Sequence, residues 1–551
     1  MTRRFSDRTR CWAVWLGLSF AFWAAPVAAQ DIEAAAGVIG RPVPQGYLDQ
    51  VRDGATFEIR RGWTVRTALA AATGSAVTGT FPVLLLPVYF ADSPAPPIPA
   101  QEIARVLFDG PNPLGTLSEY FGEASGGALD VQGDVAPWFK SSLTVAQVRG
   151  NDFGLGSDAR VGELLVEALE AADVLFDFTE FDNDGPDGVP NSGDDDGFVD
   201  AFAMEFLEAQ LTCQGQGPTI WGHRWVVSGW MGEPFQSDDL GVNGEPIQAD
   251  DYFTQAAVHC DGRVQNLVVF AHEFGHILGL PDLYDRTEGR FASLRNWVVG
   301  CWSIMAAGQW GCGPALAGGR WDRPTFFSPW EKQELGWDAA AIEVPAGQLD
   351  AEYELEPAES SGQFLVVDLS GTERLLIEYR DGSSFDVNLP GTGVAVYHVD
   401  DKNTHPRQRC RSCGQRYRVA LVEADDNASL RTIEGRGGSR GEAGDLFSDP
   451  DSRLSNVTRP STRLNSGAPT DVTIYAMTVA NGRARIRLST GVVAMESLLG
   501  PFLDGGGAAP STEETDYLDR VGNGNGAYDL GDLRRYLIEH PSALARWEGA
   551  R

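Results

Sequence analysis

One twelve-residue segment, AHEFGHILGLPD, constrains this chain more than any other feature of its sequence. It places His272 and His276 four residues apart, so a helix would present both imidazoles on one face at the spacing that zinc needs. Glu273 lies beside them, where it can take a proton from a zinc-bound water without being a ligand. Gly279 can end the helix in a left-handed cap, after which Asp282 offers a third ligand. The open fourth position predicts a catalytic zinc site and not a structural one.

The alternative to a zinc site is a surface helix that carries two histidines by chance. Only seven histidines occur in the whole chain. Both Gly279 and Asp282 extend the motif, which favours the zinc site. Two other histidines, His223 and His259, precede the helix and could line the cleft, but we assign them no role.

A methionine follows the zinc segment. The run WSIMAAG, about thirty residues after His276, resembles the methionine turn of metzincin-like peptidases. In such a turn the side chain of Met305 forms an apolar floor under the metal. The alternative is a methionine that only fills the core, which is its commoner place. The distance from the zinc segment favours the turn.

The N-terminus has the features of a secretory signal, which we assign to residues 1–29. Arginines precede an apolar stretch, and Val27-Ala28-Ala29 offers a cleavage site. The remaining chain has 39 basic and 76 acidic side chains, a net charge of −37, which argues against binding to nucleic acid or anionic membranes. No later segment is long and apolar enough to cross a bilayer. We expect a secreted bacterial protein without a transmembrane segment in its mature form, either released, periplasmic or held at the cell surface.

Six cysteines remain once the signal is removed, and an even count in an exported chain indicates disulfides. Our preferred pair is Cys301 with Cys312, which would close a loop after the active helix. Cys410 and Cys413 could form a tight bridge. The other two are Cys213 and Cys260.

The first half of the chain is typical of an α/β layer. Residues 30–79 are expected to be an N-terminal arm or pro-segment, and residues 80–340 a zincin-type peptidase domain. The apolar runs 82–90 and 201–206 predict buried strands. Asp158 is the predicted cap of a helix whose apolar positions recur with a 3.6-residue period; these are Val161, Leu164, Leu165, Ala168, Leu169 and Ala172. The metal-binding helix is expected over Val264–Leu278, beneath a twisted sheet.

The pattern changes from about Glu343, where short alternating runs recur between Gly, Asp and Pro turns. This pattern predicts an all-β sandwich domain over residues 341–492. A linker rich in Gly, Pro, Ser and Thr is expected at 493–515, and a small calcium-loop helical unit at 516–551. The predicted fold class is therefore α+β, with several domains. The strand candidates are 364–367, 375–379, 393–397, 472–475 and 484–488.

An acidic loop contains two Asp-x-Asp-Gly units. Carboxylates at alternate positions, with a glycine for a sharp turn, can surround calcium with oxygen ligands. So many carboxylates in one loop would repel one another without a cation. A solvated acidic loop is the alternative, but an apolar strand follows at once, which favours calcium. The candidate ligands are Asp182, Asp184, Asp194, Asp196 and Asp200.

The C-terminal segment has the pattern of one EF-hand-type calcium loop that enters a helix. The third, fifth, ninth and twelfth loop positions are Asn523, Asn525, Asp529 and Asp532. A valine occupies the first position, so Asp519 would serve only in a longer loop. The segment resembles one half of a dockerin repeat, and we expect an isolated stabilising calcium module.

Several separated motifs resemble the immune inhibitor A family of secreted bacterial zinc metallopeptidases, over roughly Pro82–Leu488. They are Ser118–Gly127, the acidic loop Asp182–Asp200, Ile220–Trp225, His272–Asp285, Met305, Ser328–Trp337, Leu376–Arg380 and Leu389–Gly393. The acidic loop differs from the family pattern, because extra residues separate its two Asp-x-Asp-Gly units.

The resemblance implies a zincin-type endopeptidase that acts on protein or peptide substrates. It implies one catalytic zinc ion held by His272, His276 and Asp282, with Glu273 as the catalytic base. It also implies structural calcium in the acidic loop.

Two other functions stay open at this point. One is a non-catalytic, calcium-dependent surface-binding protein with a decayed peptidase domain; however, decayed zincins usually lose a histidine or the glutamate, and neither is missing here. The other is a zinc hydrolase that acts on something other than peptides.

Overall fold

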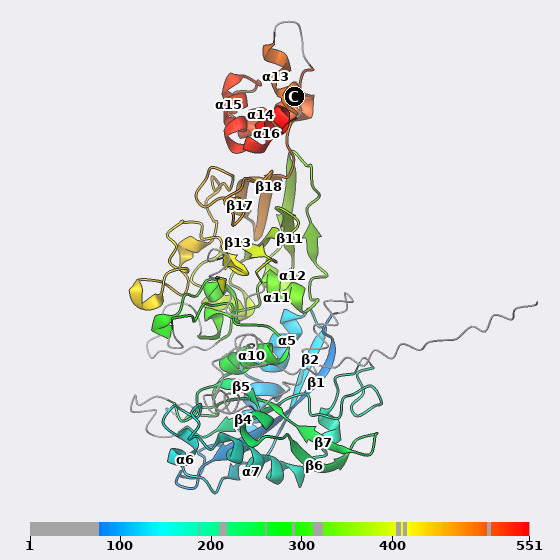
Figure 1. The fold of residues 1–551 in the computed structure, drawn as a ribbon, viewed down its shortest axis with the longest axis vertical. Coiled ribbons are helices and arrows are strands. Elements are labelled where there is room, and N and C mark those ends of the chain that lie inside the picture. The colour runs from blue at the N-terminus through cyan, green and yellow to red at the C-terminus, as the bar shows by residue number, and fades with distance from the viewer. Residues whose placement is uncertain are drawn as a thin grey trace, which may run out of the picture.

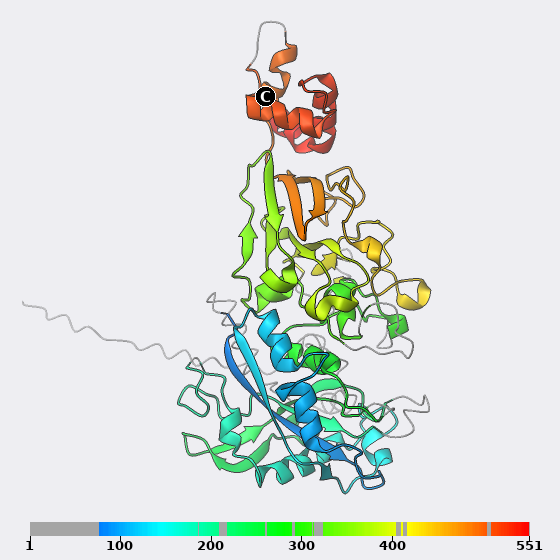
Figure 2. The same cartoon turned by 180° about the vertical axis from the view of Figure 1, so that it is seen from behind.

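The computed structural model describes residues 76–185, 187–208, 218–258, 262–288, 292–310, 312, 323–403, 409–410, 416–503 and 508–549. The molecule is elongated (Figure 1). An α/β layer lies at one end, two β-sheets lie in the middle, and a small group of helices near the C-terminus lies at the other end. Figure 2 shows the same order from behind. The mixture of helices with several sheets agrees with the predicted α+β class.

A six-stranded sheet organises the first part of the chain. Its strand order is β2-β1-β4-β8-β5, and β3 extends the pairing of β1. The pairs of β1 with β2, β3 and β4 and of β4 with β8 are parallel, whereas β5 is antiparallel to β8. The bounds are β1 Gly79–Tyr89, β2 Leu129–Val135, β3 Phe139–Lys140, β4 Phe202–Phe206, β5 His223–Val226 and β8 Asp251–Ala256. The apolar runs predicted as strands are thus β1, which begins three residues early, and β4.

Both faces of this sheet are covered, which explains the unbroken apolar sequence of β1. Val83 and Leu85 point into a core that includes helix α10 (Leu267–Ile277). The alternate residues Leu84 and Leu86 point into a second core that includes helix α7 (Val161–Asp173).

Helix α7 buries the six apolar positions that the 3.6-residue period predicts. Its predicted cap is wrong, however. Arg160 precedes the helix, and no side chain caps it. The carboxylate of Asp158 instead accepts hydrogen bonds from the backbone and side-chain amides of Asn151, because the chain turns back on itself before the helix begins.

Shorter elements surround this layer. Helix α5 begins with a capping box between Thr116 and Glu119. The bounds of these shorter elements are α4 Ala100–Ala104, the π-helix η2 Arg105–Asp109, α5 Leu117–Ala124, α6 Val145–Arg149, η3 Phe178–Phe181, α9 Ser228–Met231, β6 Phe235–Leu240, β7 Pro246–Ala249, η4 Ala292–Leu294, η5 Gly300–Trp302, η6 Ala307–Trp310 and α11 Pro329–Glu334.

Two further sheets form the middle of the molecule, and every strand candidate in this region is a strand. The first sheet has the order β16-β13-β12-β11-β9, and the second has the order β10-β18-β17. The bounds are β9 Ala341–Glu343, β10 Ala351–Leu355, α12 Ala358–Ser361, β11 Phe364–Asp368, β12 Glu373–Arg380, η7 Ser384–Asn388, β13 Gly393–Asp400, β14 Arg409–Cys410, β15 Arg416–Tyr417, β16 Val419–Leu421, η8 Glu434–Arg436, η9 Ala443–Asp445, β17 Thr473–Ala480 and β18 Arg483–Ser489.

The five-stranded sheet divides its side chains between two cores. Leu375 and Ile377 on β12 pack with residues of the three-stranded sheet, such as Ile486. Leu376, between them, packs in the same core as helix α10. The hydrophobic core of the α/β layer therefore continues across the predicted boundary at residue 340.

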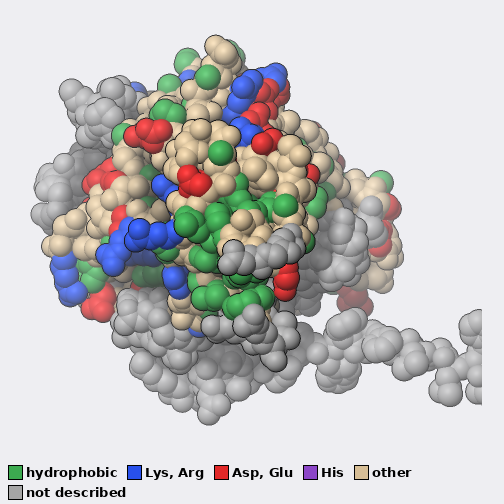
Figure 3. All heavy atoms as spheres, turned by 90° about the horizontal axis from the view of Figure 1, so that it is seen from above, with side chains coloured by type: hydrophobic (Ala, Val, Ile, Leu, Met, Phe, Trp, Pro, Cys, Tyr) green, Lys and Arg blue, Asp and Glu red, His purple; other side chains and the backbone are tan. Residues whose placement is uncertain are grey.

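The last part of the chain is helical. Helices α13 (Met495–Leu499), α14 (Thr512–Val521), α15 (Leu530–Glu539) and α16 (Pro541–Gly549) share a small core, and η10 spans Gly500–Phe502. The predicted linker 493–515 therefore contains α13 and the first residues of α14. From this end, the surface shows charged side chains of both signs with hydrophobic ones among them (Figure 3).

Some predictions fall outside the described residues. They concern the signal at 1–29, the arm at 30–79 up to residue 75, His259, Cys213, Cys260, Cys413 and the side chain of Cys410. Among the residues that are described, no helix has the length and apolarity needed to cross a membrane.

Candidate metal centre

Helix α10 carries the histidine motif through the core of the protein. It begins at Leu267, three residues later than predicted, because Asn266 caps it by accepting a hydrogen bond from the backbone N–H of Val268. Phe270 and Phe274 each make an edge-to-face contact with Phe253 on β8. The motif thus lies on a buried helix that aromatic packing fixes against the sheet.

Three side chains of the motif converge on one point. The Nε2 atoms of His272 and His276 lie 3.4 and 3.5 Å from Oδ1 of Asp282. Two ligands of a tetrahedral zinc ion, each about 2.0–2.1 Å from the metal, are about 3.3 Å apart. The distance of Asp282 Oδ1 from each histidine nitrogen therefore fits ligands that share one zinc ion.

Each imidazole is oriented by its other nitrogen. Nδ1 of His272 donates to the carbonyl of Ile304 at 2.9 Å, and Nδ1 of His276 donates to that of Leu280 at 2.7 Å. A carbonyl can only accept, so these bonds leave both Nε2 atoms unprotonated in the neutral imidazoles. Burial lowers the pKa of His272, which favours the neutral form that a metal needs.

The converging atoms are buried and have no hydrogen-bond partner among the described residues. This holds for Nε2 of His272, Nε2 of His276 and Oδ1 of Asp282. Buried polar atoms left in this state are costly unless a ligand satisfies them. A divalent metal would satisfy all three, so the donor set fits the predicted zinc ion.

The turn after the helix places Asp282 as predicted. Gly279 adopts a φ of 93°, in the left-handed region that favours glycine. Arg286 then donates from Nη1 to Oδ2 of Asp282 at 2.8 Å, which leaves Oδ1 for the metal. Burial alone would raise the pKa of Asp282, but the charge of the Arg286 guanidinium, together with the neighbouring histidines, holds it well below its usual range.

Met305 lies directly beneath helix α10. It is completely buried, and a Cβ atom added to Gly275 would lie 2.5 Å from its Sδ atom. The same turn contributes the Ile304 carbonyl that orients His272, and the Met305 carbonyl accepts from the backbone N–H of Leu283 at 2.7 Å. The turn that contains Met305 therefore packs both against helix α10 and against the loop that carries Asp282.

Glu273 is also fully buried. One of its carboxylate oxygens lies within 4.8 Å of ring nitrogens of both His272 and His276. The predicted base is thus next to the point where the ligands converge.

Several supporting residues could not be recognised in the sequence. Arg224 on β5 pairs with Asp251 on β8 and donates to the carbonyl of His276, so it binds the C-terminal end of the zinc helix. Glu331 on α11 accepts from Ser303 at 2.7 Å beside the methionine turn. No local signal identifies these residues, because each lies 27 or more positions from its partner.

His223, which precedes helix α10, has both ring nitrogens in hydrogen-bond contacts within the fold. It lies on the other face of β5 from Arg224, where its ring nitrogens contact the carbonyl of Trp221 at 2.6 Å and the hydroxyl of Tyr252 at 2.8 Å.

The disulfide between Cys301 and Cys312 is present, as predicted. It closes the segment that contains the methionine turn.

The acidic loop brings together three of the five predicted calcium ligands. One oxygen each from Asp182, Asp184 and Asp200 lies within 4.8 Å of the others. Asp194 and Asp196 lie outside this group: Asp194 accepts from the backbone N–H of Asp187 at 3.3 Å, and Asp196 accepts from that of Phe198 at 3.0 Å. Burial, with the neighbouring carboxylates, raises the pKa of Asp182 to about 7.

The C-terminal loop connects α14 to α15. Asp519 accepts from the backbone N–H of Gly526, and Asp529 is the N-cap of α15. The side-chain amides of Asn523 and Asn525 donate to Asp529. The predicted twelfth-position ligand, Asp532, is fully buried, and its two oxygens accept from the backbone N–H groups of Asn523 and Asp529.

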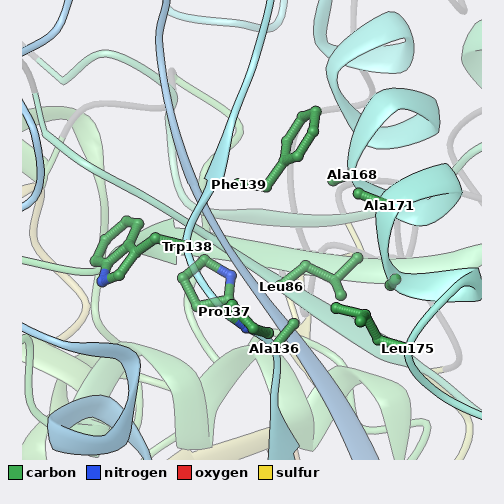
Figure 4. Close-up of a pocket in the computed structure, with 10 residues that line it drawn as sticks. Leu86, Ala136, Pro137, Trp138, Phe139, Ala168, Ala171 and Leu175 are labelled. Carbon is green, nitrogen blue, oxygen red and sulfur yellow. The ribbon is translucent and has the colours of Figure 1, made fainter.

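A small apolar cavity lies on the opposite face of the main sheet from the histidines. It is lined by Leu86, Trp138, Phe139 and Leu175, among others, between α7 and strands β1 and β3 (Figure 4). Its lining includes no titratable side chain, so it offers none of the groups that hydrolysis needs.

Comparison with known proteins agrees with this geometry. Residues 104–338 match the model of the immune inhibitor A peptidase M6 catalytic domain. The pre-pro-metalloprotease PrtV of Vibrio cholerae is 30% identical over 239 residues, which are 41% of this chain and 24% of that protein. Immune inhibitor A of Bacillus thuringiensis subsp. alesti is 31% identical over 250 residues, which are 41% of this chain and 32% of that protein. The match therefore spans 24% to 32% of these relatives' length.

The fold, the site and these matches define the class of this region: it is a metallopeptidase catalytic domain. Residues 104–338 are similar to the catalytic domain of the immune inhibitor A (M6) peptidases.

Proposed function

We propose that this chain is an exported zinc-dependent endopeptidase that hydrolyses protein substrates. One observation carries the proposal: two histidine Nε2 atoms and one aspartate oxygen, all buried, converge at the spacing of zinc ligands. His272, His276 and Asp282 would hold the ion. When bound, zinc would act as a Lewis acid that lowers the pKa of water and polarises the scissile carbonyl.

Glu273 would move the protons of the reaction. Its carboxylate is buried beside the ligand atoms, within reach of a water at the site. It would accept a proton from the attacking water and then deliver that proton to the nitrogen of the leaving amine. The Ile304 and Leu280 carbonyls would keep both histidines in the required tautomer throughout.

Calcium would have a structural role at the acidic loop. Asp182, Asp184 and Asp200 form its geometric centre, and burial of Asp182 beside other carboxylates supports a bound cation. The loop at Asn523–Asp532 would be a second, weaker site. We also propose the domain layout predicted from the sequence, with the peptidase domain followed by a β-sandwich and a helical calcium unit.

The first test is casein cleavage with and without 1,10-phenanthroline, which binds zinc but not calcium. We expect cleavage that the chelator abolishes and added zinc restores. We expect Glu273→Gln to lower kcat by about 10²–10⁴-fold while the protein retains one zinc ion per chain. Glu170→Gln, an exposed change on α7, should leave both activity and zinc content unchanged.

The outcomes separate the proposal from its alternatives. Zinc binding without cleavage of any protein substrate would indicate either a binding protein or a hydrolase for other substrates. Full activity in Glu273→Gln would contradict the assigned base.

A further inference from the structure

A further group of carboxylates lies outside all the predicted metal sites. Its members come from the segment that follows β16 and from η9. One oxygen each from Glu423, Asp425 and Asp445 lies within 4.8 Å of the others. Two oxygen ligands of the same calcium ion are at most about 5 Å apart. Glu423 and Asp445 are buried, whereas Asp425 is exposed, so a cation there would be reached from solvent on one side.

Asp445 gives independent evidence of a missing ligand. It is fully buried. Its Oδ2 atom accepts from the backbone N–H of Glu442 at 2.8 Å, but no described residue donates to Oδ1. Burial raises the pKa of Asp445 to about 7, and the carboxylates of Glu423 and Asp425 add to that rise. An ionised carboxylate in this position needs a cation or a donor that the described residues do not supply.

The other two carboxylates have only partial compensation. Glu423 accepts from the backbone N–H of Leu430 at 3.1 Å, and Asp425 accepts from the side-chain amide of Asn427 at 2.8 Å. Among the described residues, no Lys or Arg nitrogen forms an ion pair with any of the three. Burial raises the pKa of Glu423, and Arg431 opposes this rise by its charge alone, because its guanidinium donates to the backbone carbonyl of Leu421.

We propose that Glu423, Asp425 and Asp445 bind a calcium ion. The donors are all carboxylate oxygens, which suit a hard cation, and no His or Cys belongs to the group. Calcium accepts six to eight oxygen ligands in flexible geometry, so water can complete a site that is open on the Asp425 side.

The position of the site gives the ion a role. Glu423 and Asp445 lie at the two ends of the segment 423–445, so a shared ion closes this segment into a loop. The loop contacts residues 295–302 of the peptidase region through a row of backbone hydrogen bonds. They join the Val298 N–H to the Leu430 carbonyl, the Cys301 N–H to the Arg440 carbonyl and the Glu434 N–H to the Arg295 carbonyl, at 2.8 to 3.0 Å.

The contacted segment leads directly to Ile304 and Met305 beneath the zinc helix. Contact is close there: a Cβ atom on Gly300 would lie 2.7 Å from the Arg440 carbonyl, and one on Gly441 would lie 2.7 Å from the Trp302 ring. A calcium ion at the two ends of this loop thus stabilises the segment beneath the zinc site, on the side that faces the β-sheets.

The test counts calcium ions on the full chain in zinc-saturated, calcium-depleted buffer to which calcium is then added. Glu273→Gln is included throughout to prevent self-digestion. We expect Asp445→Asn to bind one calcium ion fewer than its parent by native mass spectrometry. Calcium should also raise the Tm of the parent by on the order of 3 °C more than that of the variant. The variant should fold, because the amide oxygen can still accept from Glu442.

Asp426→Asn is the matched control. It removes one negative charge from the same loop without changing the three carboxylates, and its φ of 53° is one that Asn tolerates. We expect it to keep the parent's calcium count and Tm gain. Glu423→Gln serves as a second variant and should also bind one ion fewer.

Hydrogen exchange gives a third readout. Calcium should slow exchange at residues 295–302 in the parent but not in Asp445→Asn. Equal calcium counts and equal Tm gains in the parent, Asp445→Asn and Glu423→Gln would overturn the proposal.

Discussion

At the residue scale, Arg286 decides how Asp282 can be used. Its guanidinium occupies Oδ2 and leaves Oδ1 toward the histidines. The side chain of Asp282 is therefore oriented for metal binding before a metal is bound. The motif contains the ligand, but the residue that orients the ligand lies four positions beyond it.

We therefore predict that Arg286→Gln weakens zinc binding by about 10–100-fold. The reason is that Asp282 loses both the donor that orients it and the positive charge that keeps it ionised. Competition against a chromophoric zinc chelator measures the change. Arg534→Gln, at an exposed position of α15, is the control and should bind zinc like the parent.

At the scale of elements, helix α10 and the turn that contains Met305 behave as one packed unit. Gly275 lies between the two histidines, and only the absence of its side chain allows Met305 to approach so closely. The sequence shows the glycine and the methionine separately. Their contact explains why a small residue occupies the middle of a helix, where glycine is otherwise unfavourable.

Gly275→Ala should destabilise the protein by about 1–3 kcal/mol, because the added methyl group meets the buried Met305 side chain. It should also weaken zinc binding, since the same turn orients His272. Denaturant unfolding and zinc titration measure the two effects. Gly122→Ala on α5 has nothing within 4 Å of the added methyl group, so it should cost nothing or stabilise by up to about 1 kcal/mol. Equal behaviour of the two variants would contradict the packing argument.

The C-terminal helices contain a buried histidine that should make their stability depend on pH. His540 is fully buried and stacks on Tyr536 at 4.4 Å. Burial lowers its pKa to about 4, below the value of about 6.5 for an unfolded chain. Between these two values the unfolded segment binds a proton that the folded one does not. Stability is therefore fully present above pH 6.5 and falls as the pH drops toward 4.

We predict that the helical unit loses on the order of 3 kcal/mol between pH 7 and pH 4 from this group. Hydrogen exchange of residues 512–540, corrected for the intrinsic rate, measures the loss, with strands β17 and β18 as the internal reference. His540→Gln should remove most of this pH dependence. An unchanged pH profile in the variant would assign the effect to other groups.

At the scale of the whole molecule, a buried ion network joins the peptidase region to the five-stranded sheet. Arg380 on β12 donates to Asp386 at 2.7 Å and to Glu378 at 2.9 Å, and all three are buried. Asp386 also accepts from the backbone N–H of Phe326 at 2.9 Å. The three charged side chains all belong to residues 378–386, so the network reaches the peptidase region through the hydrogen bond from Phe326 and holds Asp386 in position for it.

Arg380→Met should destabilise the whole chain by about 3–5 kcal/mol, because it leaves two buried carboxylates without their cation. Arg374→Met on the same strand breaks a partly exposed pair with Asp401 and should cost at most about 1 kcal/mol. Thermal and denaturant unfolding compare the two. A similar small cost for both would show that the network is not required to join the regions.

The sequence by itself determined most of the elements and the candidate metal ligands. Periodicity located α7, β1, β4 and the later strands, because apolar spacing follows local geometry. His272, His276 and Asp282 could be identified because they lie within eleven residues of one another, on a helix and the turn that follows it.

Only the tertiary structure decided what surrounds those ligands. Arg224 and Glu331 act on partners far away in the chain, and Asp386 of the Arg380 network accepts a hydrogen bond from Phe326, 60 positions earlier. No local pattern encodes such contacts. Contacts between distant segments also explain the boundary predicted at residue 340. The change in sequence pattern suggested a domain boundary there, but the hydrophobic core contains residues from both sides of it. Alternate residues of one strand face two different cores, and only the packed structure shows what lies against each face.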